Sequence, residues 1–128
     1  MSDSYHHHPG SGVLHELDAS EAHALLQSRQ AVLVDVREPA EFGAERIPGA
    51  LLFPLSGFDP GSLPVDRSRR IIFQCGTGRR SAQAAQRLLD AGNGEAWHLA
   101  GGLKAWKAAG LPLTSFAPAT GRVHQGHL

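Results

Sequence analysis

Blocks of apolar residues alternate along the chain with polar and glycine-rich segments, and this pattern predicts alternating strands and helices. Five strands are predicted, at residues 13–17, 31–36, 50–53, 70–75 and 95–99. The run AVLVDV is continuously apolar over most of its length, which is typical of a parallel strand buried on both faces, and RIIFQC supplies a further strand. Helices are predicted after Asp18, in a short segment near Pro39, and over 81–91 and 103–109.

This alternation predicts an α/β fold, a three-layer sandwich in which helices flank a mostly parallel central sheet of about five strands. The Gly-, Pro- and Ser-rich stretch 56–68 is expected to form an exposed loop. Residues 1–12 resemble a disordered, histidine-bearing tag, and 13–113 form the predicted domain. The apolar rhythm fades after Pro112, so 114–128 is expected to be a C-terminal tail, either poorly ordered or docked on this domain or on a partner.

Composition narrows the classes of function. Twelve basic residues balance twelve acidic ones among 128, so no overall charge favours nucleic acid or an anionic membrane. We find neither a signal-peptide pattern nor an apolar stretch of membrane-spanning length, and we expect a cytoplasmic protein. One cysteine allows no internal disulfide and no cysteine pair for zinc, and we expect neither a metal nor a cofactor.

That cysteine, Cys75, ends the strand at 70–75 and is followed by a short loop. The loop and the start of the next helix supply Gly76, Thr77, Gly78, Arg79, Arg80 and Ser81. Glycines let backbone amides turn inward, a helix start adds free N–H groups, and arginines add positive charge. Each of these favours the thiolate and could bind an anion. A lone cysteine at a strand end is more often a packed apolar residue, but the loop favours a nucleophile.

Four motifs in order make the chain resemble single-domain rhodaneses, the sulfurtransferase family. They are DVREPAEF, IPGA, CGTGRRS and AGGLKAW, and they cover about residues 13–112. The resemblance implies that Cys75 takes a sulfane sulfur from a small donor such as thiosulfate and passes it to cyanide or a thiol, with a protein acceptor as an alternative. It also implies that the loop amides surround the outer sulfur and that Arg79 or Arg80 attracts the donor.

The resemblance further implies supporting and packing roles. Asp35, Arg37 and Glu41 match a polar network near the site, and Trp106 is expected to pack the last helix against the sheet. The chain departs from the family pattern at Gly76, where many members carry arginine, and at Glu45-Arg46, which replaces a usual Gly-His.

Two other functions remain open. Cysteine-dependent phosphatases and arsenate reductases place an arginine six residues after the cysteine, where this chain has Ser81 and where Arg80 falls one short. The loop is thus one residue smaller than a phosphate cradle requires. A non-catalytic rhodanese-like binding module is the second alternative. His98 near the Gly-Gly turn is interpreted as a structural or surface histidine, and Ser81 as a cap or loop donor.

Overall fold

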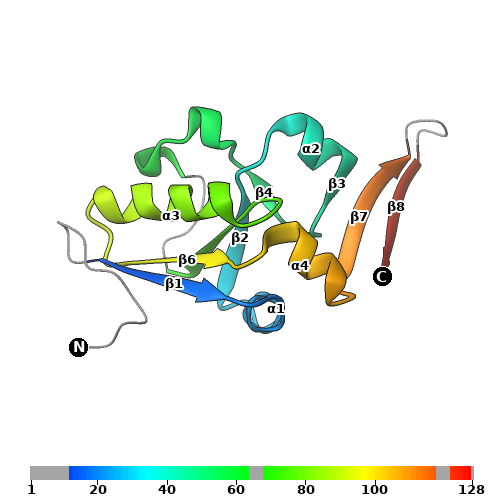
Figure 1. Cartoon of the computed structure of the whole chain (residues 1–128), viewed down its shortest axis with the longest axis horizontal. Helices are drawn as coiled ribbons and strands as arrows, with labels where there is room; N and C mark the ends of the chain where they lie inside the picture. The colour runs from blue at the N-terminus through cyan, green and yellow to red at the C-terminus, as the bar shows by residue number, and fades with distance from the viewer. Residues whose placement is uncertain (1–11, 64–67, 118–121, 128) are drawn as a thin grey trace.

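The computed structural model describes residues 12–63, 68–117 and 122–127. Five strands form the central sheet in the order β1-β6-β5-β2-β4, and each neighbouring pair is parallel (Figure 1). Their bounds are Val13–Leu17 (β1), Ala31–Asp35 (β2), Leu51–Leu52 (β4), Arg70–Gln74 (β5) and Glu95–Leu99 (β6). The predicted parallel sheet of about five strands is therefore confirmed.

Helices cover both faces of this sheet. Helices α1 (Ala19–Gln27) and α4 (Gly102–Ala108) lie on one face, and α3 (Arg79–Asp90) lies on the other (Figure 1). The apolar runs supply both cores: Leu33 and Ile72 face α1 and α4, whereas Val34 and Phe73 face α3. Successive strand residues point to opposite faces, so a strand covered on both sides must be apolar at nearly every position.

Local sequence signals fix several ends of these elements. Asp18 caps α1 as predicted: its Oδ1 accepts from the Glu21 N–H at 2.8 Å, and Glu21 Oε1 accepts from the Asp18 N–H at 3.0 Å. A short helix, α2 (Pro39–Ala44), begins at the predicted proline. The predicted loop 56–68 contains the end of one 3₁₀ turn, Leu55–Gly57, and all of a second, Pro60–Ser62.

A second, antiparallel sheet was not predicted. It joins β3 (Glu45–Arg46), β7 (Pro112–Ala117) and β8 (Arg122–His127) in the order β3-β7-β8 (Figure 1). The boundary expected at residue 113 thus falls inside a strand. Of the two alternatives for the segment after it, the first part fits docking on this domain and not poor order, because Thr114 and Ser115 pair with β3. Leu113 and Thr114 are buried there. Most of the tag-like segment, residues 1–11, lies outside the described residues.

The start of α4 packs directly on the loop that follows β5. The Leu103 N–H donates to the Cys75 carbonyl at 2.8 Å, and the Lys104 N–H donates to the Gly76 carbonyl at 3.1 Å. Gly102 makes this approach possible, because its φ is +58° and a Cβ there would collide with the Cys75 carbonyl oxygen. The Gly-Gly turn predicted from the sequence therefore positions the end of β5.

Replacing Gly102 by alanine should destabilise the fold more than the same change at Gly92. Both glycines have positive φ, but a Cβ on Gly92 meets nothing within 4 Å. We expect Gly92→Ala to lower the free energy of unfolding by about 1 kcal/mol, from backbone strain alone. The steric clash should make Gly102→Ala about 1–3 kcal/mol worse than that. Urea denaturation of the two variants measures the difference, and equal losses would contradict the packing argument.

Candidate active site

Cys75 lies directly after β5, at the carboxyl edge of the parallel sheet. It is a free cysteine with only 1% of its surface exposed. Ligands of open α/β sheets bind at this edge, where loops lead from strands into helices. Three loop residues, 76–78, separate Cys75 from the first residue of α3, which begins at Arg79 and not at Ser81 as predicted.

Gly78 gives the loop its turn. It is the N-cap of α3 with φ +102°, in the left-handed region that glycine adopts without strain. Gly76 was expected to need the same freedom, but its φ is not positive, and a Cβ there would make only an ordinary contact, 3.6 Å from Arg80 Nη2. A side chain at position 76 is therefore sterically allowed, and the glycine there is not a conformational requirement.

Backbone amides converge on the cysteine sulfur. The Gly78 N–H donates to Cys75 Sγ at 3.1 Å, and the Ser81 N–H donates at 3.4 Å. Burial raises the pKa of the Cys75 thiol, but hydrogen bonds from the backbone and hydroxyl of Ser81 and from the Gly78 and Thr77 amides outweigh burial and lower the pKa below its ordinary value. The amides at the start of α3 are free to do this because the first turn of a helix leaves them without partners.

Ser81 lies in the first turn of α3 with its side chain fully buried. Its hydroxyl lies 3.7 Å from Cys75 Sγ, donates to the Gly78 carbonyl at 3.1 Å and lies 3.0 Å from Nδ1 of His98. Ser81 was predicted to be a helix cap or a loop donor. Its hydroxyl does donate a hydrogen bond, but the residue lies inside the first turn of α3, whose N-cap is Gly78. The sequence interpretation did not connect it to His98, which is 3% exposed on β6.

The two arginines of the loop have different surroundings. Arg79 is exposed at the start of α3. Arg80 binds Glu41 of α2 through two bonds, Nη1 to Oε1 at 2.7 Å and Nη2 to Oε2 at 3.0 Å. The Arg80 guanidinium holds the pKa of Glu41 down, from 4.5 to about 2. The positive charge of Arg80 is thus held in place beside the loop by its ion pair with Glu41.

Asp35 and Arg37 form a separate, buried ion pair. Arg37 Nη2 lies 2.9 Å from Asp35 Oδ2, and the Arg37 backbone N–H donates to Asp35 Oδ1 at 2.9 Å. Gln74, the residue before the cysteine, donates through Nε2 to Asp35 Oδ2 at 2.7 Å. Arg37 also donates to the Glu45 carbonyl of β3 at 2.6 Å. The structure therefore brings Asp35 and Arg37 together, while Glu41 belongs to the surface pair with Arg80.

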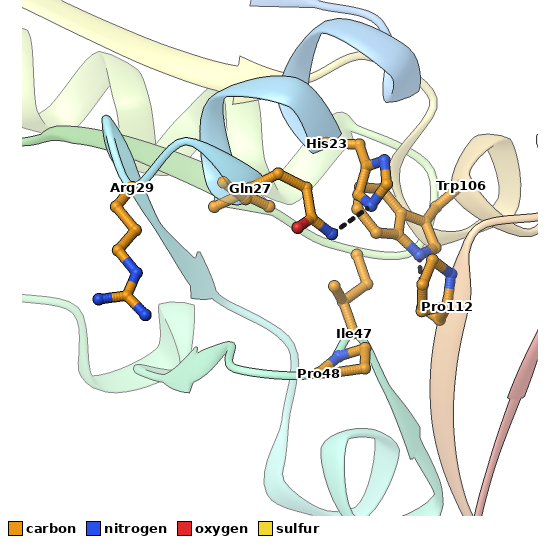
Figure 2. Close-up of a pocket in the computed structure, with 8 residues that line it drawn as sticks. His23, Gln27, Arg29, Ile47, Pro48, Trp106 and Pro112 are labelled. Carbon is orange, nitrogen blue, oxygen red and sulfur yellow. Dashed lines mark hydrogen bonds between the residues drawn. The ribbon is translucent and has the colours of Figure 1, made fainter.

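A concavity of about 310 Å³ lies between α1, the residues after β3 and α4, apart from the Cys75 loop (Figure 2). Its residues are His23, Leu26, Gln27, Arg29, Ile47, Pro48, Trp106 and Pro112. Trp106 is buried and donates through Nε1 to the Pro112 carbonyl at 2.7 Å, so it packs α4 against α1 and the sheet as predicted. His23 binds Gln27 and meets the Trp106 ring edge-on.

Metal-binding clusters and membrane-spanning helices are both absent from the part of the chain that the structure describes. Within residues 12–63, 68–117 and 122–127, no cluster of three or more His, Cys, Asp or Glu side chains has an arrangement that could hold a metal ion. Over the same residues, every helix is too short or too polar to cross a membrane.

A family model for the rhodanese-like domain matches residues 18–109. The chain belongs to the rhodanese-like family, and the resemblance read from its four motifs is confirmed.

Relatives and solved structures agree with this assignment. An uncharacterized protein from Synechocystis is 46% identical over 88 residues, and this match spans 69% of the chain and 49%, about half, of that relative. A sulfurtransferase from Allochromatium vinosum is 33% identical over 104 residues, which cover 80% of this chain and 97% of the relative. The crystal structure of a thiosulfate sulfurtransferase from Pseudomonas aeruginosa superimposes with a TM-score of 0.69 at 33% identity, over 78% of this chain and 20% of that one.

The Glu41–Arg80 pair should make stability depend on acid. Glu41 has a pKa of about 2 in the folded protein, below its ordinary 4.5, so the unfolded chain binds more protons between these values. The stabilisation is therefore present above pH 4.5 and is lost as pH falls toward 2. Both side chains are at least 36% exposed, and solvent screening limits the effect to about 1 kcal/mol.

We expect Glu41→Gln to lower the free energy of unfolding by up to about 1 kcal/mol at pH 6 and to change it little near pH 2. Urea denaturation at both pH values measures this. Glu38→Gln is the control, because the side chain of Glu38 accepts from the Ser56 hydroxyl at 3.2 Å and not from an arginine. A loss for Glu41→Gln that is the same at both pH values would contradict the assignment.

Proposed function

We propose that this protein is a sulfurtransferase in which Cys75 carries a sulfane sulfur as a persulfide. The proposed donor is a small anion such as thiosulfate or a low-molecular-weight persulfide, and the proposed acceptor is cyanide, a thiol or a thiol-bearing protein. The cradle would consist of Gly76, Thr77, Gly78, Arg79, Arg80 and Ser81. Asp35, Arg37 and Glu41 would support it without touching the transferred sulfur.

One observation carries the proposal: the sulfur of Cys75 accepts backbone N–H groups from Gly78 and Ser81 at 3.1 and 3.4 Å. These donors lower the pKa of the thiol and so favour the thiolate, which is the nucleophilic form. They belong to a turn and a helix start that are fixed by packing, so they require no rearrangement when charge develops on sulfur. Thr77 is exposed beside them, which opens the loop to the surface.

In the first step, the Cys75 thiolate attacks the outer sulfur of thiosulfate. A new S–S bond forms to Cys75, the S–S bond of the donor breaks, and sulfite leaves with the electron pair. In the resulting persulfide, the outer sulfur is bonded to Cys75 Sγ and would lie beside the loop amides. The fixed guanidinium of Arg80 would attract the anionic donor.

In the second step, the acceptor attacks the outer sulfur of the persulfide. A bond forms from that sulfur to the carbon of cyanide or to the sulfur of a thiol, and the electron pair of the broken S–S bond returns to Cys75. The enzyme regains its thiolate without a redox partner. A single cysteine is sufficient for this cycle, because no internal thiol has to resolve the intermediate.

The size of the loop favours sulfur over phosphate chemistry. The sixth residue after Cys75 is Ser81, where a phosphate cradle has an arginine, and the Ser81 side chain is directed at the cysteine and at His98. Arg80, one position earlier, already binds a carboxylate with both terminal nitrogens. The loop therefore has no uncommitted guanidinium at the position that would clamp a phosphate dianion.

Incubation with thiosulfate tests the proposal directly. We expect the intact mass to rise by one sulfur atom, the added sulfur to be released by cyanide as thiocyanate, and Cys75→Ser to abolish both results, because the oxygen of serine forms no persulfide. If the protein neither takes up sulfur nor turns over thiosulfate or persulfide donors, that result would contradict the enzyme function and favour a binding module. Rapid hydrolysis of an aryl phosphate would instead indicate phosphatase chemistry.

Arg80→Gln should weaken binding of an anionic donor more than Arg79→Gln does. The guanidinium of Arg80 is held beside Gly76 by Glu41, whereas Arg79 is exposed and subject to stronger solvent screening. We expect the KM for thiosulfate to rise about fivefold in Arg80→Gln and less than about twofold in Arg79→Gln. Steady-state kinetics at low and high salt measure both variants, which lose the same formal charge. A larger effect of Arg79→Gln would reverse this assignment.

A further inference from the structure

A chain of hydrogen bonds connects Cys75 to the protein surface. The Ser81 hydroxyl lies 3.7 Å from Cys75 Sγ and 3.0 Å from Nδ1 of His98. The other ring nitrogen, Nε2, lies 3.1 Å from Oε2 of Glu16, whose side chain is 68% exposed. Cys75, Ser81 and His98 are all buried. The chain therefore runs through the interior from the nucleophilic sulfur to a carboxylate in contact with water.

Separate elements bring these groups together. His98 on β6 is in register with Glu16 on β1 and with Phe73 on β5, and α3 places the Ser81 hydroxyl within hydrogen-bond distance of Nδ1 of the ring. Glu16 faces the ring directly and Cys75 faces it through Ser81, while β5 presents the uncharged Phe73 in register. The arginines of α3 are exposed or engaged elsewhere: Arg79 is exposed, Arg80 binds Glu41, and Arg87 binds the Leu55 carbonyl.

Glu16 determines which nitrogen of His98 carries hydrogen. A carboxylate oxygen only accepts, so the bond to Glu16 requires a hydrogen on Nε2. In the neutral ring, Nδ1 is then an acceptor, and the single hydrogen of the Ser81 hydroxyl can be donated to it. The Cys75 thiol in turn donates to the Ser81 oxygen. In this state the hydrogens of the Cys75 thiol and of the Ser81 hydroxyl both point away from the sulfur and toward the imidazole.

We propose that His98 is a positioning residue for Cys75, which takes up the proton of the thiol by way of the Ser81 hydroxyl. The S–H bond of Cys75 breaks as its proton passes to the Ser81 oxygen, and the O–H bond of Ser81 breaks as its proton passes to Nδ1. The products are a thiolate and an imidazolium, so the total charge is unchanged. This inference rests on the sulfur transfer proposed above and adds His98 and Glu16 to it.

The proton on His98 also sets the direction of the Ser81 hydroxyl. The Gly78 carbonyl, 3.1 Å away, competes for the hydrogen of this hydroxyl. While Nδ1 is neutral, the ring competes as well. Once Nδ1 carries a hydrogen it donates to the Ser81 oxygen and no longer accepts, and a negatively charged sulfur is a stronger acceptor than a neutral carbonyl. Protonated His98 therefore leaves the hydroxyl to bind the thiolate as a third donor, beside the Gly78 and Ser81 amides.

His98→Asn tests the inference, because an amide can bind Ser81 but cannot take up a proton. The rate of alkylation of Cys75 by iodoacetamide, measured against pH, reports the thiolate fraction. We expect the midpoint of this profile to move upward by about one pH unit, so that the variant reacts about tenfold more slowly on the acidic side. A purely structural His98 would leave the midpoint in place.

Thermodynamic linkage requires the reverse effect on His98. In the wild-type protein, just above the midpoint of the Cys75 alkylation profile, the imidazole ¹⁵N NMR shifts of His98 should move from those of an imidazolium toward those of a neutral ring when Cys75 is blocked by iodoacetamide as a neutral thioether. Ser81→Ala removes the connecting hydroxyl and leaves both titrating groups. It should reduce the response of His98 to blocking and raise the alkylation midpoint.

His15→Asn is the matched control. Like His98, His15 on β1 binds a glutamate through Nε2, in this case Glu95 at 2.8 Å. Its ring stacks on Trp97, whereas the ring of His98 meets Ser81. The Cys75 alkylation profile of His15→Asn should superimpose on that of the wild type. An unchanged profile in His98→Asn, or ring signals of His98 that do not change when Cys75 is blocked, would overturn the inference. If His98→Asn fails to fold, the wild-type NMR comparison decides alone. Alkylation needs no sulfur donor, so this result is independent of whether thiosulfate turns over.

Discussion

The site depends on one residue being held from two sides at the end of a central strand. The Cys75 carbonyl accepts from the Leu103 N–H at the start of α4, and the Cys75 sulfur accepts from amides at the start of α3. These two helices lie on opposite faces of the sheet, so both cores fix the position of Cys75. Gly102 permits the contact on one side and Gly78 the turn on the other. The geometry of the loop therefore follows from helix–sheet packing and not from the loop alone.

Charge is arranged in two layers around this contact. The buried Asp35–Arg37 pair is compensated by further hydrogen bonds to Gln74 and to the Glu45 carbonyl, which is the condition under which a buried ion pair is tolerated. It joins the ends of β2 and β5 to β3, directly before Cys75. The Glu41–Arg80 pair is partly exposed, so it contributes little to stability. It does fix the position of the Arg80 guanidinium beside the loop.

The sequence predicts the parts of this arrangement that arise from local pattern. Two-sided burial produced the apolar runs of β2 and β5, and the loop after Cys75 was recognisable from residue types alone. Strand β3 and its pairing with β7 were not predictable in this way, because the pairing joins Arg46 to Thr114 through backbone groups that leave no apolar rhythm. The contact of His98 with Ser81 was not predicted, although it follows from strand alternation: Ala96 and His98 share one side of β6, and Ala96 lies in the core beneath α3.

The same arrangement explains why we favour sulfur transfer for a chain without net charge. Two amides and one hydroxyl surround the sulfur, and the nearest fixed guanidinium is shared with Glu41. Such donors stabilise one negative charge on a polarisable atom at short range, whereas a phosphate dianion needs a bidentate cation directed at its oxygens. A thiolate and a persulfide each carry a single charge, one bond apart. Donors fixed at the N-cap and in the first turn of α3 would serve both, because in the proposed cycle the charge moves outward by only one sulfur atom.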